Sequence, residues 1–367
     1  MEITDLLIAT HKNKASDLHI STRNPPIMRV NGDMLPLDMP ALDGEEVKRM
    51  LFSIMTDQQR SDYEQELELD FSISFASDMR FRVNTFNTIY GAAAVFRTIP
   101  TKILTLEALN TPEVLKRLCH LHKGLILVTG PTGSGKSTTL AAMVDYINCN
   151  FNKHILTVED PVEFVHTPRR SLVNQREVGG STKSFAKALK SALREDPDVI
   201  LVGELRDLET IQLAMTAAET GHLVLGTLHT SSAAKTVDRI IDVFPSDDKE
   251  MVRAMLSVSL EAVIAQTLVK RADGKGRVAA HEIMLGTPAI RNLIREAKVP
   301  QITSMIQMGS KVGMVLMRDS LNRLYENGDI SSDTLRELLI TGAQNDDEPT
   351  GIPGSAAAPA KRATNSF

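Results

Sequence analysis

The feature that most constrains how this chain folds is a glycine loop at residues 130–137, which matches the pattern G-x-x-x-x-G-K-[ST] at every position. An apolar run at 125–129 precedes the loop and predicts a buried parallel strand. Residues 138–147 follow with apolar side chains at helical spacing. An ordinary glycine turn is the alternative, but a strand, this loop and a helix in that order are typical of phosphate binding.

The residue types in the loop indicate how it would hold a triphosphate. Gly130, Gly133 and Gly135 can adopt a positive φ, so that backbone N–H groups turn toward phosphate oxygens. The helix that follows adds unpaired N–H groups and the positive end of its dipole. Lys136 is predicted to reach the β- and γ-phosphates, and Ser137 to bind Mg²⁺. The residues predicted to bind the nucleotide are Gly130, Pro131, Thr132, Gly133, Ser134, Gly135, Lys136, Ser137 and Thr138.

Length and composition limit the classes of protein that fit. At 367 residues the chain is longer than one ordinary domain, so two domains are expected. The absence of Trp, an aromatic content of 4% and a net charge of −5 argue against a nucleic-acid-binding surface. Cys119 and Cys149 are too few for a disulfide framework or a four-thiolate zinc site, which favours a cytosolic protein. We expect neither an export signal nor a membrane span.

Residues 1–100 predict a small α+β domain, and residues 101–110 a linker to the rest of the chain. Thr56 is predicted to cap one of its helices. Helices are expected at 3–14, 45–55 and 56–67, and strands at 17–20, 27–30, 70–75, 79–84 and 92–97.

Three arginines lie on two of these strands. Arg80 and Arg82 alternate with Phe81 and Val83, so the two arginines share one face of their strand. Arg97 ends the last strand of the domain. By themselves, these arginines fit a solvated sheet face.

From residue 111 onward, short apolar strands alternate with helices, a pattern typical of a doubly wound parallel sheet that binds ligands at the carboxyl ends of its strands. We expect this domain to cover 111–342, followed by a disordered tail at 343–367 that lacks periodicity. Strands are expected at 125–129, 154–158, 199–202, 223–228 and 277–284, and helices at 138–147, 184–194, 208–218, 249–269, 288–296, 299–308, 312–326 and 332–339.

Carboxylates follow two of the predicted strands. Glu204 comes after an apolar run, but Gly203 stands where an Asp is usual, so Glu204 is predicted to hold Mg²⁺ through a water. Glu163 lies three residues past Asp160 and is the first candidate to orient the water that attacks the γ-phosphate, with Glu204 as the second. One of Glu159 and Asp160 is expected to serve the turn before a proline.

Two histidines, His222 and His229, flank the strand at 223–228. A pair of core or capping histidines explains them better than metal ligation, because a metal site would need more ligands nearby. The residues alone therefore assign these histidines no chemistry.

Taken together, several segments resemble one family of motor proteins. Residues 130–137, 155–164, 196–204 and 220–230 resemble the Walker A, Asp box, Walker B and His box of the secretion-superfamily ATPases. Residues 15–19 and 289–296 narrow the resemblance to the PilT family, the retraction ATPases of type IV pili. The similarity covers residues 1–340.

This resemblance implies a cytoplasmic homohexameric ring whose subunits have a PAS-like N-terminal domain and a RecA-like ATPase domain with C-terminal helices. It also implies that ATP and Mg²⁺ bind between the two domains, and that hydrolysis drives pilus disassembly and twitching motility. The implied partners are an inner-membrane platform protein at the cytoplasmic face and a paralogous retraction ATPase, with peripheral membrane docking and no nucleic acid.

The resemblance also assigns roles to single residues. Arg82 and Arg97 match the arginines that approach the γ-phosphate, and Glu163 matches the catalytic glutamate. Glu204 matches the Walker B glutamate. The segment 289–296 would be needed for retraction but not for nucleotide binding, although its spacing alone indicates a plain amphipathic helix. His222 and His229 match the His-box pair, which senses the nucleotide.

Four other functions compete with this interpretation. A pilus-assembly or type II secretion ATPase usually carries a four-cysteine metal element, which two cysteines cannot build. An auxiliary retraction paralogue or a nucleotide-regulated scaffold would share the fold, but Lys136, Glu163 and Glu204 favour turnover. A nucleic-acid translocase would need a basic face, which the sequence lacks.

Overall fold

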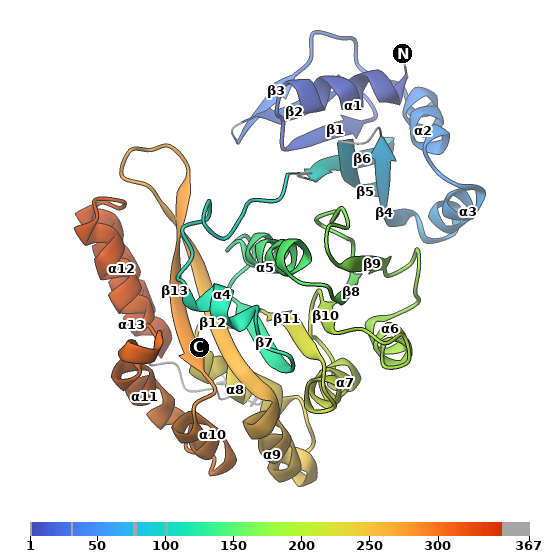
Figure 1. Ribbon diagram of the computed structural model, residues 1–367. Coiled ribbons are helices and arrows are strands. Elements are labelled where there is room, and N and C mark those ends of the chain that lie inside the picture. Colours follow the sequence, from blue (N-terminus) through green and yellow to red (C-terminus); the bar gives the residue numbers. More distant parts are fainter. Residues whose placement is uncertain (1, 31, 76–78, 100–101, 347–367) are drawn as a thin grey trace, which may run out of the picture.

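The computed structural model describes residues 2–30, 32–75, 79–99 and 102–346. The described residues form two β-sheets with helices around each, and the N-terminal sheet lies above the other in Figure 1. The last helix, α13 (Ser332–Asp346), continues past residue 343, where the predicted tail begins. Residues 347–367 of that tail lie outside the described residues.

The N-terminal sheet is antiparallel, as the alternating sequence predicts. Phe81 and Val83 are fully buried in its core, whereas Arg80 and Arg82 lie on the opposite face. The strands are β1 (Asp17–Ser21), β2 (Ile27–Val30), β3 (Asp33–Pro36), β4 (Glu68–Phe75), β5 (Met79–Thr88) and β6 (Gly91–Ile99), in the order β3-β2-β1-β6-β5-β4.

Helices α1 (Ile3–Lys12), α2 (Gly44–Ser53) and α3 (Asp57–Glu66) complete this part of the chain. The last of them begins at the predicted cap, because the Thr56 hydroxyl accepts the Gln59 N–H and the Gln59 side chain accepts the Thr56 N–H. Beyond the sheet, residues 102–110 contain no helix or strand. Leu106 is nevertheless buried, and the predicted domain boundaries stay a prediction.

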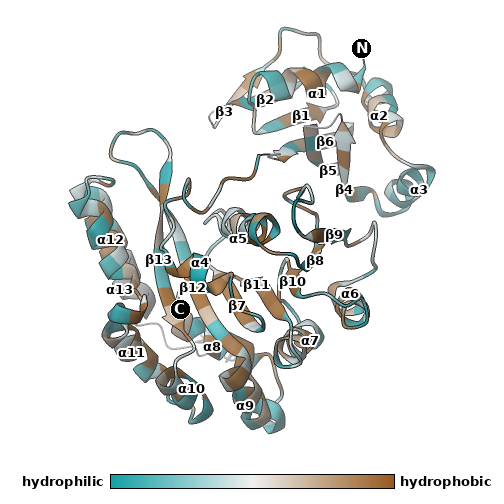
Figure 2. Cartoon of the chain, viewed as in Figure 1, coloured by the Kyte–Doolittle hydropathy of each residue, from teal (hydrophilic) through white to brown (hydrophobic). Residues whose placement is uncertain are grey.

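The second sheet is the doubly wound parallel sheet that the sequence predicts, with one antiparallel edge strand. Figure 2 shows hydrophobic residues throughout its central strands. Its strands are β7 (Gly124–Thr129), β8 (His154–Glu159), β9 (Leu172–Glu177), β10 (Val199–Val202), β11 (Leu223–Leu228), β12 (Leu260–Lys270) and β13 (Arg277–Leu285), in the order β13-β12-β7-β11-β10-β8-β9.

Helices cover both faces of this sheet. On β7, Ile126 and Val128 face the cluster that contains Leu140 of α5 (Lys136–Asn150), whereas Leu127 faces the cluster of α7 (Leu208–Glu219). The other helices are α4 (Val114–Leu118), α6 (Phe185–Ala192), α8 (Ala233–Asp242), α9 (Lys249–Ser259), α10 (Pro288–Arg295), α11 (Ile302–Met308) and α12 (Met317–Glu326), with 3₁₀ turns at Ser246–Asp248, Val299–Gln301 and Ser310–Val312.

One predicted helix is wrong. The expected helix at 249–269 ends at Ser259, and the chain continues as β12, which pairs with β7 and β13. Residues 262–265 are buried on both faces, and such an apolar run does not distinguish a buried strand from a buried helix by periodicity. Strands β3 and β9 and helices α4 and α8 lie outside the ranges expected from the sequence. Every helix in the described part of the chain is too short or too polar to cross a membrane.

Candidate active site

A cavity of about 520 Å³ opens at the carboxyl ends of the parallel strands, between the two sheets. Both parts of the chain line it, because Arg82 comes from β5 whereas Lys136, Glu163, Glu204 and His229 come from the second sheet and its loops. Of the glycine loop and the start of α5, the lining residues are Thr132, Gly133, Gly135, Lys136, Ser137 and Thr138. The topology therefore brings most of the predicted site together where a doubly wound sheet binds its ligand.

The glycine loop has the backbone that the pattern predicts. Gly130, Gly133 and Gly135 have φ values of 141°, 78° and 87°, all in the region that favours glycine. A Cβ on Gly130 would lie 2.2 Å from the Gln266 carbonyl oxygen, so the loop packs too closely for a side chain there. No side chain caps α5, which leaves its N-terminal N–H groups facing the cavity for an anion.

Lys136 lies at the base of this loop. Its ammonium donates hydrogen bonds to the carbonyl oxygens of Gly130 and Pro131, at 2.9 Å and 3.1 Å. Burial lowers the pKa of Lys136, while the carboxylates of Glu204 and Glu163 act to raise it. The lysine therefore lies close to both candidate carboxylates, where it can contact a phosphate between them.

Gln266 of β12 fixes the loop from beneath, a role that the sequence analysis missed. The side-chain amide of Gln266 makes both contacts. Its Nε2–H donates to the Ser134 backbone carbonyl at 2.7 Å, and its Oε1 accepts from the Thr139 hydroxyl at 2.7 Å. Gln266 is buried, so each of these groups would lack a partner without it. The predicted helix at 249–269 concealed this residue, because only a strand beside β7 places it under the loop.

Glu163 lies on the loop that follows β8, and a buried carboxyl group holds this loop. Glu159 accepts the Glu163 N–H at 3.3 Å and the Thr157 hydroxyl at 2.7 Å. Burial raises the pKa of Glu159 despite these hydrogen bonds. Of Glu159 and Asp160, one was expected to serve the turn before Pro161, and Glu159 does so by holding this loop. Asp160 is instead exposed at the cavity wall.

Glu204 follows β10 and contacts two basic side chains, Arg206 at 2.6 Å and His229 at 3.3 Å. Burial opposes ionisation of Glu204, but Arg206, with His229, holds its pKa below the usual value. The preceding Gly203 packs closely, since a Cβ there would lie 3.2 Å from the Glu159 Cα. A side chain at residue 203 would therefore crowd the backbone of Glu159.

Among the described residues of the N-terminal sheet, Arg82 reaches the cavity. Its guanidinium pairs with Asp70 at 2.9 Å, and this hydrogen bond raises its pKa, together with the charges of Asp160 and Glu163. Arg97 lies opposite Arg82 in the ladder but is not among the lining residues. It pairs with Asp17 at 3.0 Å, and its side chain is 69% exposed.

The structure separates the two histidines. His229 follows β11 and lines the cavity. His222 precedes the same strand and therefore lies at its amino end, on the side of the sheet away from the cavity. There its carbonyl accepts the Gly124 N–H at 3.0 Å, and its ring nitrogen lies 3.0 Å from the Ala217 carbonyl. His222 is therefore not among the residues that line the cavity of this chain, and its predicted role at the nucleotide stays a prediction.

Three further lining residues with ionisable side chains were not predicted: His166, Arg206 and Arg277. His166 is buried, which lowers its pKa to about 4 and keeps it neutral near pH 7. Arg206 stands two residues after Glu204, and that spacing was the one signal that could have identified it. Arg277 reaches the cavity only because β13 pairs with β12.

The donor atoms in the cavity suit Mg²⁺. Ser137 offers a hydroxyl and Glu204 a carboxylate, and Mg²⁺ takes one or two such ligands together with water and phosphate oxygens. In the described ranges, no cluster of three His, Cys, Asp or Glu residues is arranged to hold a metal by itself. Ser137 and Glu204 therefore fit a magnesium ion that also takes water and phosphate oxygens as ligands.

Comparison with known proteins agrees with this geometry. The family model described as type II/IV secretion system protein matches residues 2–336. The type IV pilus retraction ATPase PilT of Pseudomonas aeruginosa is 59% identical over 337 residues, covering 92% of this chain and 98% of PilT. A twitching motility protein of Neisseria gonorrhoeae is 59% identical over 311 residues, covering 85% of this chain and 83% of that protein.

Among solved structures, the pilus retraction motor PilT with bound ADP is 46% identical to this chain. That structure superimposes with a TM-score of 0.86 and covers 92% of this chain and 96% of the PilT chain. Both sheets and the residues that line the cavity lie within residues 2–336, which the family model matches. The chain therefore belongs to the type II/IV secretion system protein family, as an α/β ATPase of the PilT type.

Proposed function

We propose that this protein is an ATP-hydrolysing motor that powers retraction of type IV pili and thereby twitching motility. The observation that carries the proposal is one cavity that combines the glycine loop, Glu163 and Glu204 with Arg82 from the other sheet. Relatives at 59% identity are named for pilus retraction and twitching motility. Phosphoryl transfer needs positioning and charge stabilisation, which these groups can supply.

In this proposal, each group has a defined task. The loop N–H groups and Lys136 bind the phosphates, and Ser137 and Glu204 hold Mg²⁺, Glu204 through a water. Bound Mg²⁺ would neutralise charge that develops on the phosphate oxygens. Glu163 orients the attacking water, and Arg82 stabilises the transferred phosphoryl group. Arg97 and His222 would need domain motion or a neighbouring subunit to take part.

The assembly is part of the same proposal. A cytoplasmic homohexamer with a PAS-like part at residues 1–100 and a RecA-like part at 111–342 would place six such cavities in one ring. Changes between the two parts would transmit force to a platform protein at the inner membrane, with a paralogous ATPase as a second partner. The cavity between the sheets supports this proposal, since closing it around ATP must move one sheet relative to the other.

The test of the enzyme is steady-state phosphate release by the wild type and by Glu163→Gln. We expect at least about a hundredfold loss of turnover in the variant, because the attacking water loses its carboxylate. Glu219→Gln, at the end of α7 and outside the cavity, is the matched control and should keep wild-type turnover. Equal phosphate release by all three proteins would reject Glu163 as the base.

Gene deletion in the host bacterium tests the direction of the motor. Loss of a retraction motor should leave hyperpiliated cells that do not move by twitching. Cells without pili would instead indicate a pilus-assembly ATPase. A deletion strain with unchanged pili and weakened retraction would indicate an auxiliary paralogue. In the phosphate-release assay, a wild-type protein without turnover would indicate a scaffold.

A further inference from the structure

A second polar cluster joins the two sheets beside the cavity, and neither the sequence motifs nor the proposed chemistry includes it. Glu177, the last residue of β9, receives hydrogen bonds from both sheets. Ser72 Oγ donates to Glu177 Oε1 at 2.7 Å, and Arg80 Nη2 lies 2.6 Å from Glu177 Oε2. The side chains of Arg80 and Glu177 are only 14% and 20% exposed, so this ion pair is largely shielded from water.

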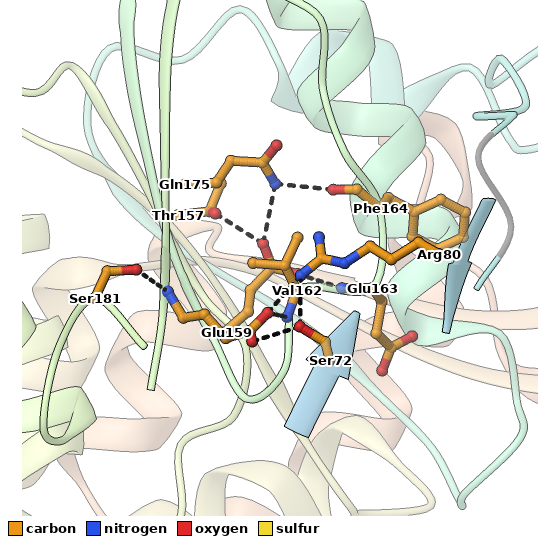
Figure 3. A network of polar contacts seen from close by, with 10 residues as sticks. Ser72, Arg80, Thr157, Glu159, Val162, Glu163, Phe164, Gln175 and Ser181 are labelled. Carbon is orange, nitrogen blue, oxygen red and sulfur yellow. Dashed lines mark hydrogen bonds and ion pairs between the residues drawn. The ribbon is translucent and has the colours of Figure 1, made fainter. Parts of the chain in front are cut away.

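The other donor to this carboxylate is the loop that carries Glu163. The Val162 N–H donates to Glu177 Oε2 at 3.0 Å, and Val162 is the residue directly before Glu163. Figure 3 shows Ser72 and Arg80 of the N-terminal sheet meeting this loop beside Val162 and Glu163. A single carboxylate oxygen of Glu177 is thus shared between the guanidinium of one sheet and the catalytic loop of the other.

The backbone of Glu177 is held firmly. Its carbonyl accepts the N–H groups of Gly180, Ser181 and Thr182, and its own N–H donates to the Ser181 hydroxyl at 3.1 Å. The carboxylate therefore extends from a fixed point on the second sheet. Any displacement of the N-terminal sheet must lengthen the contacts to Ser72 and Arg80 before it disturbs this turn.

We propose that Glu177 is a positioning residue that couples the N-terminal sheet to Glu163, and that the Arg80–Glu177 pair must be formed for rapid hydrolysis. The proposal rests on the proposed function of Glu163. With the pair formed, Arg80 orients the carboxylate that holds the Val162 N–H, and Glu159 holds the Glu163 N–H from the other side. With the pair broken, the carboxylate turns toward water and one of the two anchors of the loop is lost.

The size of the effect follows from geometry. A carboxylate that orients an attacking water must lie within hydrogen-bond reach of it, and a displacement of about 1 Å can cost roughly a hundredfold in rate. Nucleotide binding depends instead on the glycine loop and Lys136, which do not contact Glu177 among the described interactions. Breaking the pair should therefore lower kcat and leave affinity for nucleotide nearly unchanged.

The experiment is a double-mutant cycle on the full-length protein with Arg80→Met, Glu177→Ala and the double variant. Turnover of ATP gives kcat and KM, and titration with a fluorescent ADP analogue gives Kd. We expect each single variant to lose about tenfold or more in kcat, with Kd changed by less than about threefold. Because both residues act through one contact, the double variant should be no slower than Glu177→Ala.

Glu177→Gln separates the two halves of the contact. Glutamine keeps a carbonyl oxygen that can accept the Val162 N–H, but it lacks the charge that pairs with Arg80. This variant should lie between the wild type and Glu177→Ala in kcat. If Glu177→Gln has the same kcat as Glu177→Ala, the ion pair alone carries the coupling. If Glu177→Gln has the kcat of the wild type while Arg80→Met is slower, the proposed coupling is contradicted.

Arg176→Met is the matched control. Arg176 precedes Glu177 on β9 and pairs at 2.9 Å with Glu195, in the turn after α6. The two side chains are 23% and 32% exposed, but this pair does not join the two sheets. Its removal should leave kcat within about twofold of the wild type. Equal losses in Arg176→Met and Arg80→Met would show general destabilisation and overturn the proposal, as would a wild-type or increased kcat in Arg80→Met.

The result is distinguishable from failure of the proposed function. A wild type without phosphate release would refute the ATPase itself. Normal turnover in Glu163→Gln would remove Glu163 from the chemistry, and the coupling to Glu163 with it. The third outcome is that the wild type turns over ATP, Glu163→Gln abolishes turnover, and the effects of Arg80→Met and Glu177→Ala on kcat are additive. This outcome would refute the coupling but leave the proposed function intact.

Discussion

Arg82 and Arg97 stand directly opposite each other on β5 and β6, yet only Arg82 lines the cavity. Residues opposite each other in an antiparallel pair point to the same face, so the two guanidinium groups belong to one basic surface. The two guanidinium groups differ in their position relative to the cavity. Arg82 lies near Asp160 and Glu163, whereas Arg97 pairs with Asp17. This arrangement predicts unequal contributions to hydrolysis.

Arg82→Ala should lower kcat by roughly 10³-fold, the lower end of what an arginine facing a transferred phosphoryl group contributes. Affinity for ADP should change far less, since ADP lacks the γ-phosphate. Arg97→Ala should reduce kcat more weakly, because its side chain must first leave Asp17. Phosphate release and ADP titration on both variants check this order, and a loss of ADP binding without a loss of kcat would place Arg82 elsewhere.

Lys136→Ala should abolish measurable turnover and weaken binding of ATP. Lys136 lies at the base of the glycine loop, and no other lysine lines the cavity within the described ranges. Lys190→Ala, which removes an exposed lysine paired with Glu209 on the surface, is the control. Normal hydrolysis by Lys136→Ala would show that the loop does not bind the phosphates.

Gln266→Leu should destabilise the protein by about 1–3 kcal/mol, because it leaves the Ser134 carbonyl and the Thr139 hydroxyl without their buried partner. The loop should also become mobile, so that nucleotide affinity falls along with stability. Urea unfolding and ADP titration measure the two effects. Gln212→Leu, on the exposed side of α7, should change neither, and a Gln266→Leu protein with wild-type affinity would exclude a role in shaping the loop.

The sequence predicts the parts of this site that depend on local pattern. The strand, the glycine loop and α5 are contiguous, so their geometry follows from neighbouring residues. Glu163 and Glu204 follow apolar strands, and parallel strands end at one edge of a sheet. His222 precedes β11, so the same arrangement of parallel strands places it at the amino ends of the strands, away from the cavity. The motif resemblance nevertheless grouped it with His229.

The parts that sequence reasoning missed depend on contacts between distant segments. Glu177 ends a strand that reads Leu-Val-Asn-Gln-Arg-Glu, which is mostly polar because β9 is an edge strand with only β8 beside it. Gln266 interrupts an apolar run that fits a helix as well as a strand. Neither position carries a signal until the topology brings it beside the cavity.

Stability should depend on pH through a buried histidine. Burial lowers the pKa of His281 from 6.5 to about 4, so between these values the unfolded chain binds a proton that the folded protein does not. Stability is therefore full above about pH 6.5 and falls as pH drops toward 4, by at most about 3 kcal/mol. His281→Leu should reduce the slope of unfolding free energy against pH in this range, and His166, whose pKa is also about 4, should contribute to the slope that remains. Identical slopes for wild type and His281→Leu would contradict the assignment.

A change on the exposed side of α10 should separate hydrolysis from movement. Figure 1 places α10 beside α9, at the end of the molecule away from the N-terminal sheet. Ile290 and Ile294 are buried in the core, whereas Arg295 is exposed at the end of the helix. Arg295→Glu should keep ATP turnover within about twofold of wild type, because it touches neither the core nor the cavity. If the helix serves retraction, cells carrying this variant should keep surface pili but lose twitching.

Arg291, on the same helix, provides the contrast that makes the measurement specific. Its guanidinium donates to the carbonyls of Ser257 and Gly286, at 3.0 Å and 2.7 Å, and pairs with Glu261 at 2.7 Å. Arg291→Ala should therefore lower the free energy of unfolding by about 1–3 kcal/mol, since it leaves these partly buried groups without a donor. Arg295→Glu should not lower it. If Arg295→Glu loses turnover and stability together, the helix is a structural element and its link to retraction is wrong.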